Sequence, residues 1–446
     1  MNLDIFKAYD IRGKVGSELT TDVAWNVGKA LADWLPTDGA VAIGYDMRPD
    51  SEELANALIE GVRLQGREVV NIGQVTSDMI YFAVGHLNLA GGAMITASHN
   101  PGEYNGIKLC REQAKPIGID TGLLDIRDAA AGGNFVPAVE KANQTTRDIR
   151  ADWISYILGF VQVKDWPAYK VAVDAGNGMA GAIVPILQEQ VPLQITPMYF
   201  ELDGTFPNHP ANPLLPEALL DIQKKIHDDQ LDFGIAFDGD GDRAVLIDEK
   251  GEALSGTTTL AILAKYFLAK QPGATVLYNA ICGRAVKETI EANGGKAFRT
   301  KVGHSYIKAA MREYDAVLAG EHSGHYYFRD NYSADSGLLA AMIAIQVLAE
   351  SGKTMSQLAG EFKTYVSISE TNFEVTDKDT IIARVKEAFQ DGTQDELDGL
   401  TVNYPNAWFN VRASNTEPLL RLNAEAKTQD ELDQLVQRVK AVISGN

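Results

Sequence analysis

The distribution of apolar and polar positions along the chain predicts alternating strands and helices. Three segments share one order, a short apolar run, a polar or glycine-rich turn and then a helical pattern, at residues 40–65, 170–190 and 274–293. Short apolar runs that alternate with helical patterns are typical of β-α-β units in mixed or mainly parallel sheets. Because the units recur at spacings above about 100 residues, we expect repeated α/β domains rather than a solenoid.

The pattern changes toward the C-terminus. Strand patterns at residues 400–404, 408–412 and 419–424 precede a helical pattern at residues 429–443. This order predicts a small α+β unit. We therefore expect an α/β protein with three similar mixed-sheet α/β domains plus a smaller α+β C-terminal domain.

Three shifts in composition suggest where the domains meet. Residues 129–146 are small and polar, residues 248–251 form a turn after a strand pattern, and the pattern changes again at residues 365–371. Polar, glycine-rich stretches commonly separate compact domains. We place the four domains at residues 1–144, 145–250, 251–366 and 367–446.

Chain length indicates more than one domain, and net charge limits the classes of molecule that the protein can bind. The 446 residues exceed what one hydrophobic core usually supports. The 40 basic and 60 acidic side chains give a net charge of −20. Such a surface disfavours nucleic acids and anionic membranes, so we expect neither as a partner. A small anionic substrate requires a cleft that concentrates positive charge.

The cysteine count and the apolar runs point to the cytoplasm. Two cysteines, Cys110 and Cys282, are too few for a disulfide scaffold and fit a reducing compartment. The charged N-terminal sequence does not resemble a signal peptide. The most apolar stretch, residues 337–349, is too short to span a bilayer and predicts a buried helix.

The most informative motif is D-G-D-G-D-R at residues 238–243, which lies between two apolar strand patterns. Carboxylates as close as those of Asp238, Asp240 and Asp242 repel one another unless a cation lies between them. Ligation by oxygen alone suits Mg²⁺ before Ca²⁺ or Mn²⁺. Arg243 beside such an ion suggests a phosphate partner.

Two other interpretations of this motif remain open. The first is an acidic turn without metal. The second is an EF-hand loop, in which the three aspartates and Glu249 take positions 1, 3, 5 and 12. Arg243 stands where that loop needs glycine, and the flanks indicate strands rather than helices.

A second motif, T-A-S-H-N-P at residues 96–101, follows an apolar strand pattern. Ser98 is a candidate nucleophile or phosphoryl carrier, and the alternative is an ordinary turn serine. Adjacent side chains on an extended chain point to opposite sides, which argues against His99 as an in-line base. No G-x-S-x-G sequence surrounds Ser98, so a Ser-His-Asp hydrolase is disfavoured.

Residues 320–325, G-E-H-S-G-H, follow another apolar strand pattern. The Glu321 carboxylate and the Ser323 hydroxyl, two residues apart, can bind neighbouring hydroxyls of a sugar. A zinc site at His322 and His325 is the competing hypothesis. It lacks the glutamate of H-E-x-x-H and a supporting cysteine pair.

The last motif, R-A-S-N-T-E-P at residues 412–418, is followed by Arg421. A guanidinium, hydroxyls, an amide and exposed backbone N–H groups form an anion cradle, and a capped surface turn is the alternative. Arg12 in a turn near the N-terminus, and Lys301 with His304 in a glycine loop, are weaker candidates.

Taken together, these segments resemble the α-D-phosphohexomutase superfamily, most closely its phosphomannomutase and phosphoglucomutase branch. The resemblance covers the whole chain in order, in YDIRG (9–13), TASHNP (96–101), DGDGDR (238–243), TKVGH (300–304), GEHSGH (320–325) and RASNTEP (412–418). Asn415 differs from the glycine common in phosphoglucosamine mutases, and His322 from the methionine of several relatives.

The resemblance implies four domains around a central cleft, a phosphoserine at Ser98, and Mg²⁺ as the cofactor. The implied metal ligands are Ser98, Asp238, Asp240 and Asp242. The implied catalytic residues are Ser98, Arg12, Lys108, Arg243 and His304. The implied substrate-binding residues are Tyr9, Lys301, Glu321, Ser323, His325, Arg412, Ser414, Asn415, Thr416 and Arg421.

The implied reaction converts mannose 6-phosphate to mannose 1-phosphate through hexose 1,6-bisphosphate, which also acts as an activator. Glucose phosphates remain an alternative or additional substrate, because the two sugars differ at one hydroxyl. A metal-dependent phosphatase with Asp238 as nucleophile is a further alternative, but it needs a lysine and acids in another arrangement. The expected partners are small hexose phosphates, and the expected state is a monomer or weak homodimer.

Overall fold

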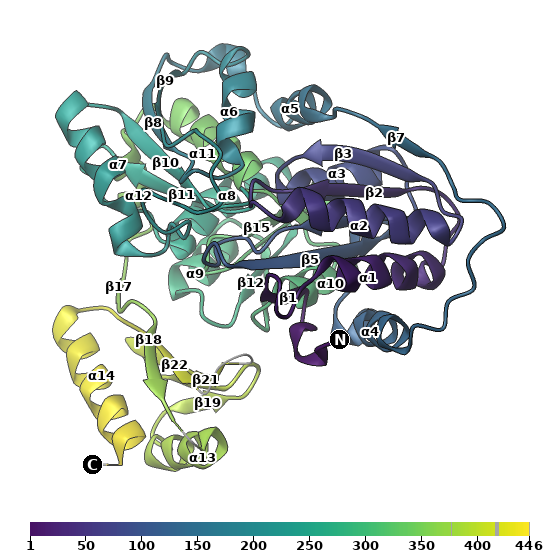
Figure 1. Cartoon of the computed structure of the whole chain (residues 1–446). Coiled ribbons are helices and arrows are strands. Elements are labelled where there is room, and N and C mark those ends of the chain that lie inside the picture. Colours follow the sequence, from purple (N-terminus) through teal and green to yellow (C-terminus); the bar gives the residue numbers. More distant parts are fainter. Residues whose placement is uncertain (376, 415–418, 446) are drawn as a thin grey trace. The chain divides into compact units, whose positions relative to one another are not determined.

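The computed structural model describes residues 1–375, 377–414 and 419–445 (Figure 1). The chain divides into two compact units. The larger unit comprises Met1–Ser255 and Ser323–Leu358, and the smaller unit comprises Gly256–His322 and Ala359–Asn446. No helix in the described part of the chain has the length and hydrophobicity of a membrane-spanning segment.

The N-terminal part of the larger unit is a mixed sheet in the order β1-β5-β4-β2-β3-β7, with β6 beside β5. β2 is parallel to β3 and β4, whereas β5 is antiparallel to β1 and β4. Apolar side chains of the strands and helices are fully buried between them, as at Leu31, Ile43 and Leu58. The elements are β1 (Ile11–Lys14), α1 (Thr21–Trp34), β2 (Val41–Tyr45), α2 (Ser51–Leu64), β3 (Val69–Gln74), α3 (Ser77–His86), β4 (Gly91–Ile95), β5 (Tyr104–Arg111), β6 (Lys115–Pro116), α4 (Leu123–Gly132) and β7 (Gln144–Thr146).

A second sheet of the larger unit has the order β11-β10-β8-β9. β8 is parallel to β9 and β10, and β10 and β11 form an antiparallel pair whose connecting turn is the D-G-D-G-D-R motif. Both strand patterns predicted around the motif are therefore confirmed. The strands β15 (Tyr326–Phe328) and β16 (Ala334–Asp335) of the same unit are not part of this sheet and pair antiparallel with each other. The other elements are α5 (Arg150–Leu158), β8 (Lys170–Asp174), α6 (Ala180–Gln188), β9 (Gln194–Met198), α7 (Pro216–Asp229), β10 (Phe233–Phe237), β11 (Ala244–Asp248) and α11 (Gly337–Ser351).

In the smaller unit, β12 pairs in parallel with β13 and β14, and α8, α9 and α10 accompany these strands. A second sheet has the order β17-β22-β21-β20-β19, with β18 also beside β22. The elements are α8 (Gly256–Lys270), β12 (Thr275–Asn279), α9 (Arg284–Ala292), β13 (Lys296–Thr300), α10 (His304–Glu313), β14 (Leu318–Gly320), β17 (Val366–Ser367), β18 (Thr371–Glu374), α13 (Lys378–Ala388), β19 (Thr393–Asp395), β20 (Leu400–Asn403), β21 (Ala407–Ala413), β22 (Leu419–Ala426) and α14 (Gln429–Ser444).

The predicted fold class is confirmed, because α/β regions with mixed sheets precede a C-terminal sheet with two helices. The helix predicted at residues 337–349 is α11, and its apolar side chains are almost all buried, as expected. The three predicted C-terminal strands are β20, β21 and β22, and the final helix is α14. The predicted domain boundaries at residues 144, 250 and 366 stay predictions.

Candidate active site

Ser98 lies in the loop that joins β4 to β5. Its backbone φ is 50°, in the left-handed region that residues other than glycine seldom adopt. The Ser98 amide donates a hydrogen bond to the hydroxyl of Thr96 at 2.9 Å. Only 4% of Ser98 is exposed. The loop therefore presents the hydroxyl inside the protein, which an ordinary surface turn would not do.

The turn between β10 and β11 brings three buried aspartates to this hydroxyl. Carboxylate oxygens of Asp238, Asp240 and Asp242 lie within 4.8 Å of one another. Ser98 Oγ donates to Asp238 Oδ2 at 2.9 Å. Among the described residues, Asp240 Oδ1 is buried without a hydrogen-bond partner. These oxygen donors, one of them buried and unsatisfied, fit a hard divalent cation such as Mg²⁺.

Glycines let the aspartate turn approach the serine loop closely. A Cβ at Gly239 would lie 2.5 Å from the carbonyl oxygen of Ser98, so a larger residue there forces one loop away from the other. Gly241 has a φ of +76°, which also favours glycine. The alternation of aspartate and glycine in the motif therefore serves both ligand convergence and contact with Ser98.

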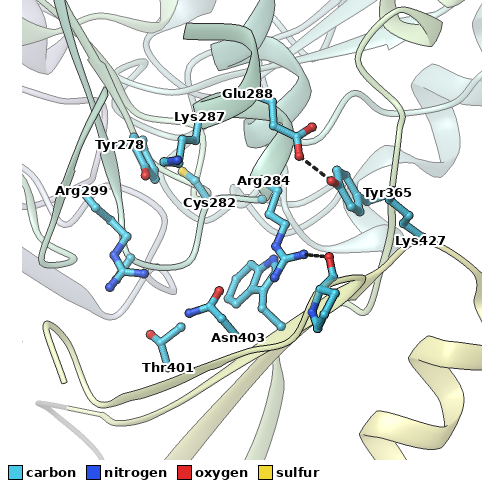
Figure 2. A pocket seen from close by; sticks show the side chains of 14 residues that line it. Tyr278, Cys282, Arg284, Lys287, Glu288, Arg299, Tyr365, Thr401, Asn403 and Lys427 are labelled. Carbon is cyan, nitrogen blue, oxygen red and sulfur yellow. Dashed lines mark hydrogen bonds between the residues drawn. The ribbon is translucent and has the colours of Figure 1, made fainter. Parts of the chain in front are cut away.

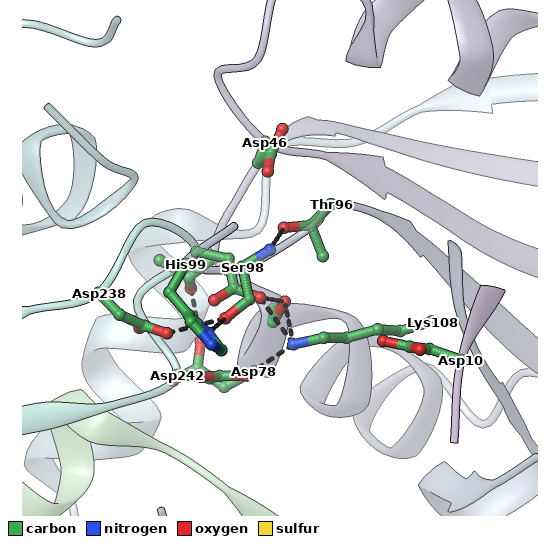
Figure 3. A network of polar contacts seen from close by, with 12 residues as sticks. Asp10, Asp46, Asp78, Thr96, Ser98, His99, Lys108, Asp238 and Asp242 are labelled. Carbon is green, nitrogen blue, oxygen red and sulfur yellow. Dashed lines mark hydrogen bonds and ion pairs between the residues drawn. The ribbon is translucent and has the colours of Figure 1, made fainter. Parts of the chain in front are cut away.

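Two cations complete the cluster in the larger unit. Lys108 Nζ, from β5, lies 2.7 Å from both Asp240 Oδ2 and Asp242 Oδ2 (Figure 3). Arg243 Nε donates to Asp238 Oδ2 at 2.9 Å, and within the described chain its buried Nη2 has no hydrogen-bond partner. An unsatisfied guanidinium nitrogen beside the serine suits a phosphate oxygen.

The pKa values reflect how tightly these charges are packed. Burial and the negative charge of Asp242 raise the pKa of Asp238 to about 7. Burial alone would lower the pKa of Lys108, but Asp240 and Asp242 outweigh it and hold the pKa well above its usual value. Lys108 is therefore a stable cation in this arrangement, suited to charge stabilisation rather than to proton transfer.

The expectation that the Ser98 and His99 side chains point apart is wrong. Ser98 Oγ lies 3.1 Å from His99 Nδ1. That expectation assumed an extended backbone, whereas the left-handed φ of Ser98 turns the two side chains to the same side. Burial and the nearby cations Arg243 and Arg12 hold the pKa of His99 well below its ordinary value, so its imidazole is neutral. A pKa this low makes the ring a weak base, and the Ser98 hydroxyl donates its proton to Asp238, so His99 is a hydrogen-bond partner of Ser98 Oγ.

The other candidates of the larger unit lie around this cluster. Arg12, on β1, donates to Asn100 Oδ1 of the serine loop at 2.7 Å and to Asp10 at 2.5 Å. His325 Nε2 lies 3.5 Å from Asp242 Oδ1, and its Nδ1 lies 3.1 Å from Ser323 Oγ. The partly buried Tyr9 lies just before β1.

In the smaller unit, Arg412 and Arg421 face each other across β21 and β22. Both donate to one carboxylate, that of Glu370, at 3.0 and 3.2 Å. Arg421 also lies 3.5 Å from the Ser414 hydroxyl. The two arginines therefore lie close together next to the described part of the R-A-S-N-T-E-P motif, residues 412–414, whereas Asn415 and Thr416 lie outside the described residues.

The remaining candidates of this unit lie at strand ends and a helix start. Glu321 is 3% exposed just after β14 and accepts a hydrogen bond from Asn279 at 3.3 Å. His304 begins α10, and Lys301 is exposed with its Nζ 5.9 Å from the centre of the Tyr306 ring. The two units thus hold separate groups of the predicted residues.

Several polar residues around these groups gave no signal in the sequence. Ser77 Oγ donates to Asp240 Oδ2 at 2.5 Å from the start of α3. Arg48 binds the backbone of the serine loop, and Glu370 is the shared acceptor of two arginines. Only the three-dimensional arrangement identifies them, because each lies in an unremarkable polar segment far from its partner along the chain.

The smaller unit also contains a pocket of ≈ 620 Å³ between α9 and the C-terminal sheet (Figure 2). Several of its polar groups have partners within the unit. The Arg284 guanidinium donates to the carbonyls of Tyr404, Pro405 and Ala407 at 2.6–2.9 Å. Arg299 pairs with Asp395. These contacts fasten α9 and β13 to the C-terminal sheet.

Comparison with known proteins matches this architecture along the whole chain. Family models described as phosphoglucomutase/phosphomannomutase alpha/beta/alpha domains I, II and III and C-terminal domain match residues 3–133, 151–251, 255–365 and 370–442. The chain is 40% identical to a protein of Xanthomonas campestris pv. campestris named phosphohexose mutases, over 96% of each chain. It is 38% identical to a phosphomannomutase of Salmonella montevideo, over 96% of this chain and 95% of that one.

A solved structure agrees with the sequence comparison. The crystal structure of a phosphoglucomutase/phosphomannomutase family protein from Burkholderia thailandensis has a TM-score of 0.92 at 31% identity, and covers 100% of this chain and 98% of that chain. The chain is therefore an isomerase of the phosphohexomutase class, which acts by phosphoryl transfer. It belongs to the phosphoglucomutase/phosphomannomutase family of the α-D-phosphohexomutase superfamily.

Proposed function

We propose that the protein is a phosphomannomutase that interconverts mannose 6-phosphate and mannose 1-phosphate. Phosphoserine 98 and a hexose 1,6-bisphosphate intermediate carry the phosphoryl group. The observation that carries this proposal is the Ser98 hydroxyl, 2.9 Å from Asp238 inside a buried cluster with Lys108 and Arg243. The relative named phosphomannomutase supports mannose phosphate as the substrate.

The reaction consists of two transfers in opposite directions. A free hydroxyl of the hexose monophosphate attacks the phosphorus of phosphoserine 98, the bond from phosphorus to Ser98 Oγ breaks, and the hydroxyl proton passes to a base. After the bisphosphate reverses its orientation, Ser98 Oγ attacks the other phosphoryl group and the free sugar hydroxyl forms again. The neutral His99 ring nitrogen, 3.1 Å from Ser98 Oγ, orients that oxygen by a hydrogen bond.

Charge on the transferring phosphoryl oxygens is stabilised by fixed cations. The free Arg243 Nη2 is the donor for one such oxygen, and Lys108 supplies positive charge from β5. Asp238, Asp240 and Asp242, together with Ser98, would hold the Mg²⁺ ion. When bound, that ion offsets negative charge on the phosphoryl group.

Residues of the smaller unit are assigned to substrate binding. Arg412 and Arg421, with the R-A-S-N-T-E-P turn, grip the phosphate that does not react, while Glu321 binds sugar hydroxyls. Binding energy from the distant phosphate positions the reacting end, which raises the rate of transfer. Because the two phosphates exchange places between the two transfers, the same groups serve both orientations.

A broader substrate range is the second candidate. The Xanthomonas relative carries the plural name phosphohexose mutases, which favours a dual phosphomannomutase and phosphoglucomutase. Mannose and glucose differ at one hydroxyl, and contacts to other hydroxyls do not separate them. Values of kcat/KM for mannose 1-phosphate and glucose 1-phosphate, measured side by side, decide between the two.

The Ser98→Ala variant tests the proposal. Without the phosphoryl carrier, turnover of mannose 1-phosphate with Mg²⁺ and hexose 1,6-bisphosphate is expected to fall to background. Intact-mass and peptide analysis of the wild type is expected to show one added phosphoryl group at residue 98. The exposed Ser155 of α5 provides a matched control, because Ser155→Ala should keep full activity. Full activity of Ser98→Ala, or phosphate release that exceeds isomerisation in the wild type, would contradict the proposal.

A further inference from the structure

Arg48 reaches from the end of β2 into the serine loop, and its guanidinium binds four carbonyl oxygens there. Nη1 donates to the carbonyls of Pro101 and Tyr104, both at 2.8 Å. Nη2 donates to the carbonyls of Ser98 and Asn100 at 2.9 and 2.6 Å. All four acceptors lie within residues 98–104, so one planar group fixes the path of the whole loop.

The guanidinium is held rigidly from the sheet side. Arg48 is 3% exposed, and its Nε lies 3.3 Å from Oδ2 of the fully buried Asp46. Asp46 Oδ1 accepts hydrogen bonds from the Ser51 hydroxyl at 2.5 Å and from the Arg48 amide at 3.0 Å. The Asp46 amide donates to the carbonyl of Ile95, the last residue of β4. Arg48 and Asp46, together called the clamp, are therefore anchored to the two parallel strands β2 and β4.

A segment that follows β9 covers the clamp from the other side. The Phe206 ring centre lies 5.1 Å from Arg48 Cζ, within the range of a cation–π interaction. A Cβ at Gly204 would lie 2.4 Å from Arg48 Cα, so this segment runs directly against the Arg48 backbone. Arg48 is thus enclosed on both sides, and its guanidinium is committed to the loop rather than to a substrate.

We propose that Arg48 is the positioning residue for phosphoryl transfer at Ser98, an inference that rests on the proposed function. Ser98 has a left-handed backbone, which a residue with a side chain adopts at an energetic cost. The Arg48 bonds to the carbonyls of Ser98 and Asn100 hold the backbone that leaves Ser98 in that conformation. The Ser98 hydroxyl consequently stays on Asp238, and the phosphoserine keeps its orientation toward the incoming hydroxyl.

The test is Arg48→Lys in the full-length protein, assayed with mannose 1-phosphate, Mg²⁺ and hexose 1,6-bisphosphate. An ammonium group cannot span four carbonyls, so the loop is expected to shift. A displacement of about 1 Å costs about 10²-fold in rate, so kcat should fall by about that factor while KM stays within about threefold. The half-life of the Ser98 phosphoryl group, followed by intact mass, should shorten because water gains access.

Arg67 offers a matched control in the same unit. It also binds backbone carbonyls, those of Ala32, Leu35 and Thr37 at 2.5–2.7 Å, near the end of α1. Arg67→Lys should therefore also lower thermal stability but leave kcat and the phosphoserine half-life unchanged. Equal losses of kcat in the two variants would show a general stability effect and overturn the proposal.

Two further results keep the proposal falsifiable. If Arg48→Lys does not fold, Phe206→Leu loosens the clamp more mildly and should lower kcat about threefold at unchanged KM; wild-type kcat in that variant overturns the proposal. Absence of mutase turnover in the wild type contradicts the proposed function itself. An active wild type with unchanged kcat in Arg48→Lys contradicts only the role of Arg48.

Discussion

At the residue scale, His209 and Asp174 form an ion pair close to the aspartate turn. His209 Nε2 lies 3.1 Å from Asp174 Oδ2, and Nδ1 lies 2.9 Å from the carbonyl oxygen of Pro210. A ring that donates from both nitrogens is protonated. Burial alone would lower the pKa of His209, but Asp174 and Pro210 outweigh it and raise the pKa above its ordinary value.

This pair predicts a pH-dependent part of the stability. Because the pKa of His209 is raised in the folded protein, the contribution is complete below the unfolded pKa of about 6.5 and is lost as pH rises through the folded pKa. His209→Gln should therefore lower the urea midpoint at pH 6 and make little difference at pH 9. The exposed His227 is the control, and His227→Gln should follow the wild type at both pH values. Equal destabilisation by His209→Gln at both values would exclude a protonated pair.

Individual residues also show which features of the candidate site could be predicted from the sequence. The aspartates of D-G-D-G-D-R converge as the motif predicts, because their spacing within one turn leaves little freedom. The relation of Ser98 to His99 could not be predicted, because one backbone angle reverses it. Only the family resemblance assigned Lys108 to the active site. Its partners Asp240 and Asp242 are 132 and 134 residues away in sequence, so no local pattern connects them.

At the element scale, the site depends on two loops packed against each other, the β4–β5 loop and the β10–β11 turn. Gly239→Ala should lower kcat by about 10²-fold or more, because its Cβ would lie 2.5 Å from the Ser98 carbonyl oxygen and the loops must separate. Thermal stability should fall as well. Turnover and the melting temperature of the purified variant check both expectations.

Gly132, the last residue of α4, supplies the control for this substitution. A Cβ there would meet no atom within 4 Å, so Gly132→Ala should leave activity unchanged and stability unchanged or slightly higher. Wild-type activity in Gly239→Ala would show that the two loops do not need this close approach.

Elements with strong patterns were predicted well, and the loops between them were not. The helical pattern at the end of residues 40–65 is α2 (Ser51–Leu64), because its apolar spacing matches one buried face. The polar segment before it, which contains Asp46 and Arg48, has no periodicity. Its partners belong to another loop, so only the folded chain assigns it a role.

At the scale of the whole molecule, the net negative charge does not show that cationic side chains gather at particular places. The family resemblance implies a central cleft that would gather the cations Arg12, Lys108, Arg243, Lys301, Arg412 and Arg421, and this stays a prediction. Each unit does place cations beside carboxylates, as Lys108 with Asp240 and Arg412 with Glu370. The sequence could not supply Glu370, because it lies 42 residues from Arg412 and outside every recognised motif.

In the smaller unit, the contacts of Arg284 predict how a substitution there changes the stability of the C-terminal sheet. Arg284→Lys should lose at least two of the three hydrogen bonds to the carbonyls of residues 404–407, at a cost of about 1–3 kcal/mol. Hydrogen exchange should accelerate in the segment from β20 to β21. Lys287→Ala, at a half-exposed position on the same helix, should leave exchange there unchanged. Unchanged exchange in Arg284→Lys would show that α9 does not hold this sheet.

The hydrogen bond between Ser98 and Asp238 joins positions 140 residues apart in one chain. During synthesis, Ser98 leaves the ribosome long before the aspartates and Arg243 that surround its hydroxyl. The cluster at Ser98 therefore cannot form until the segment through β11 has emerged and paired. Under the proposed function, every molecule that carries a phosphoryl group at Ser98 has passed this point in folding.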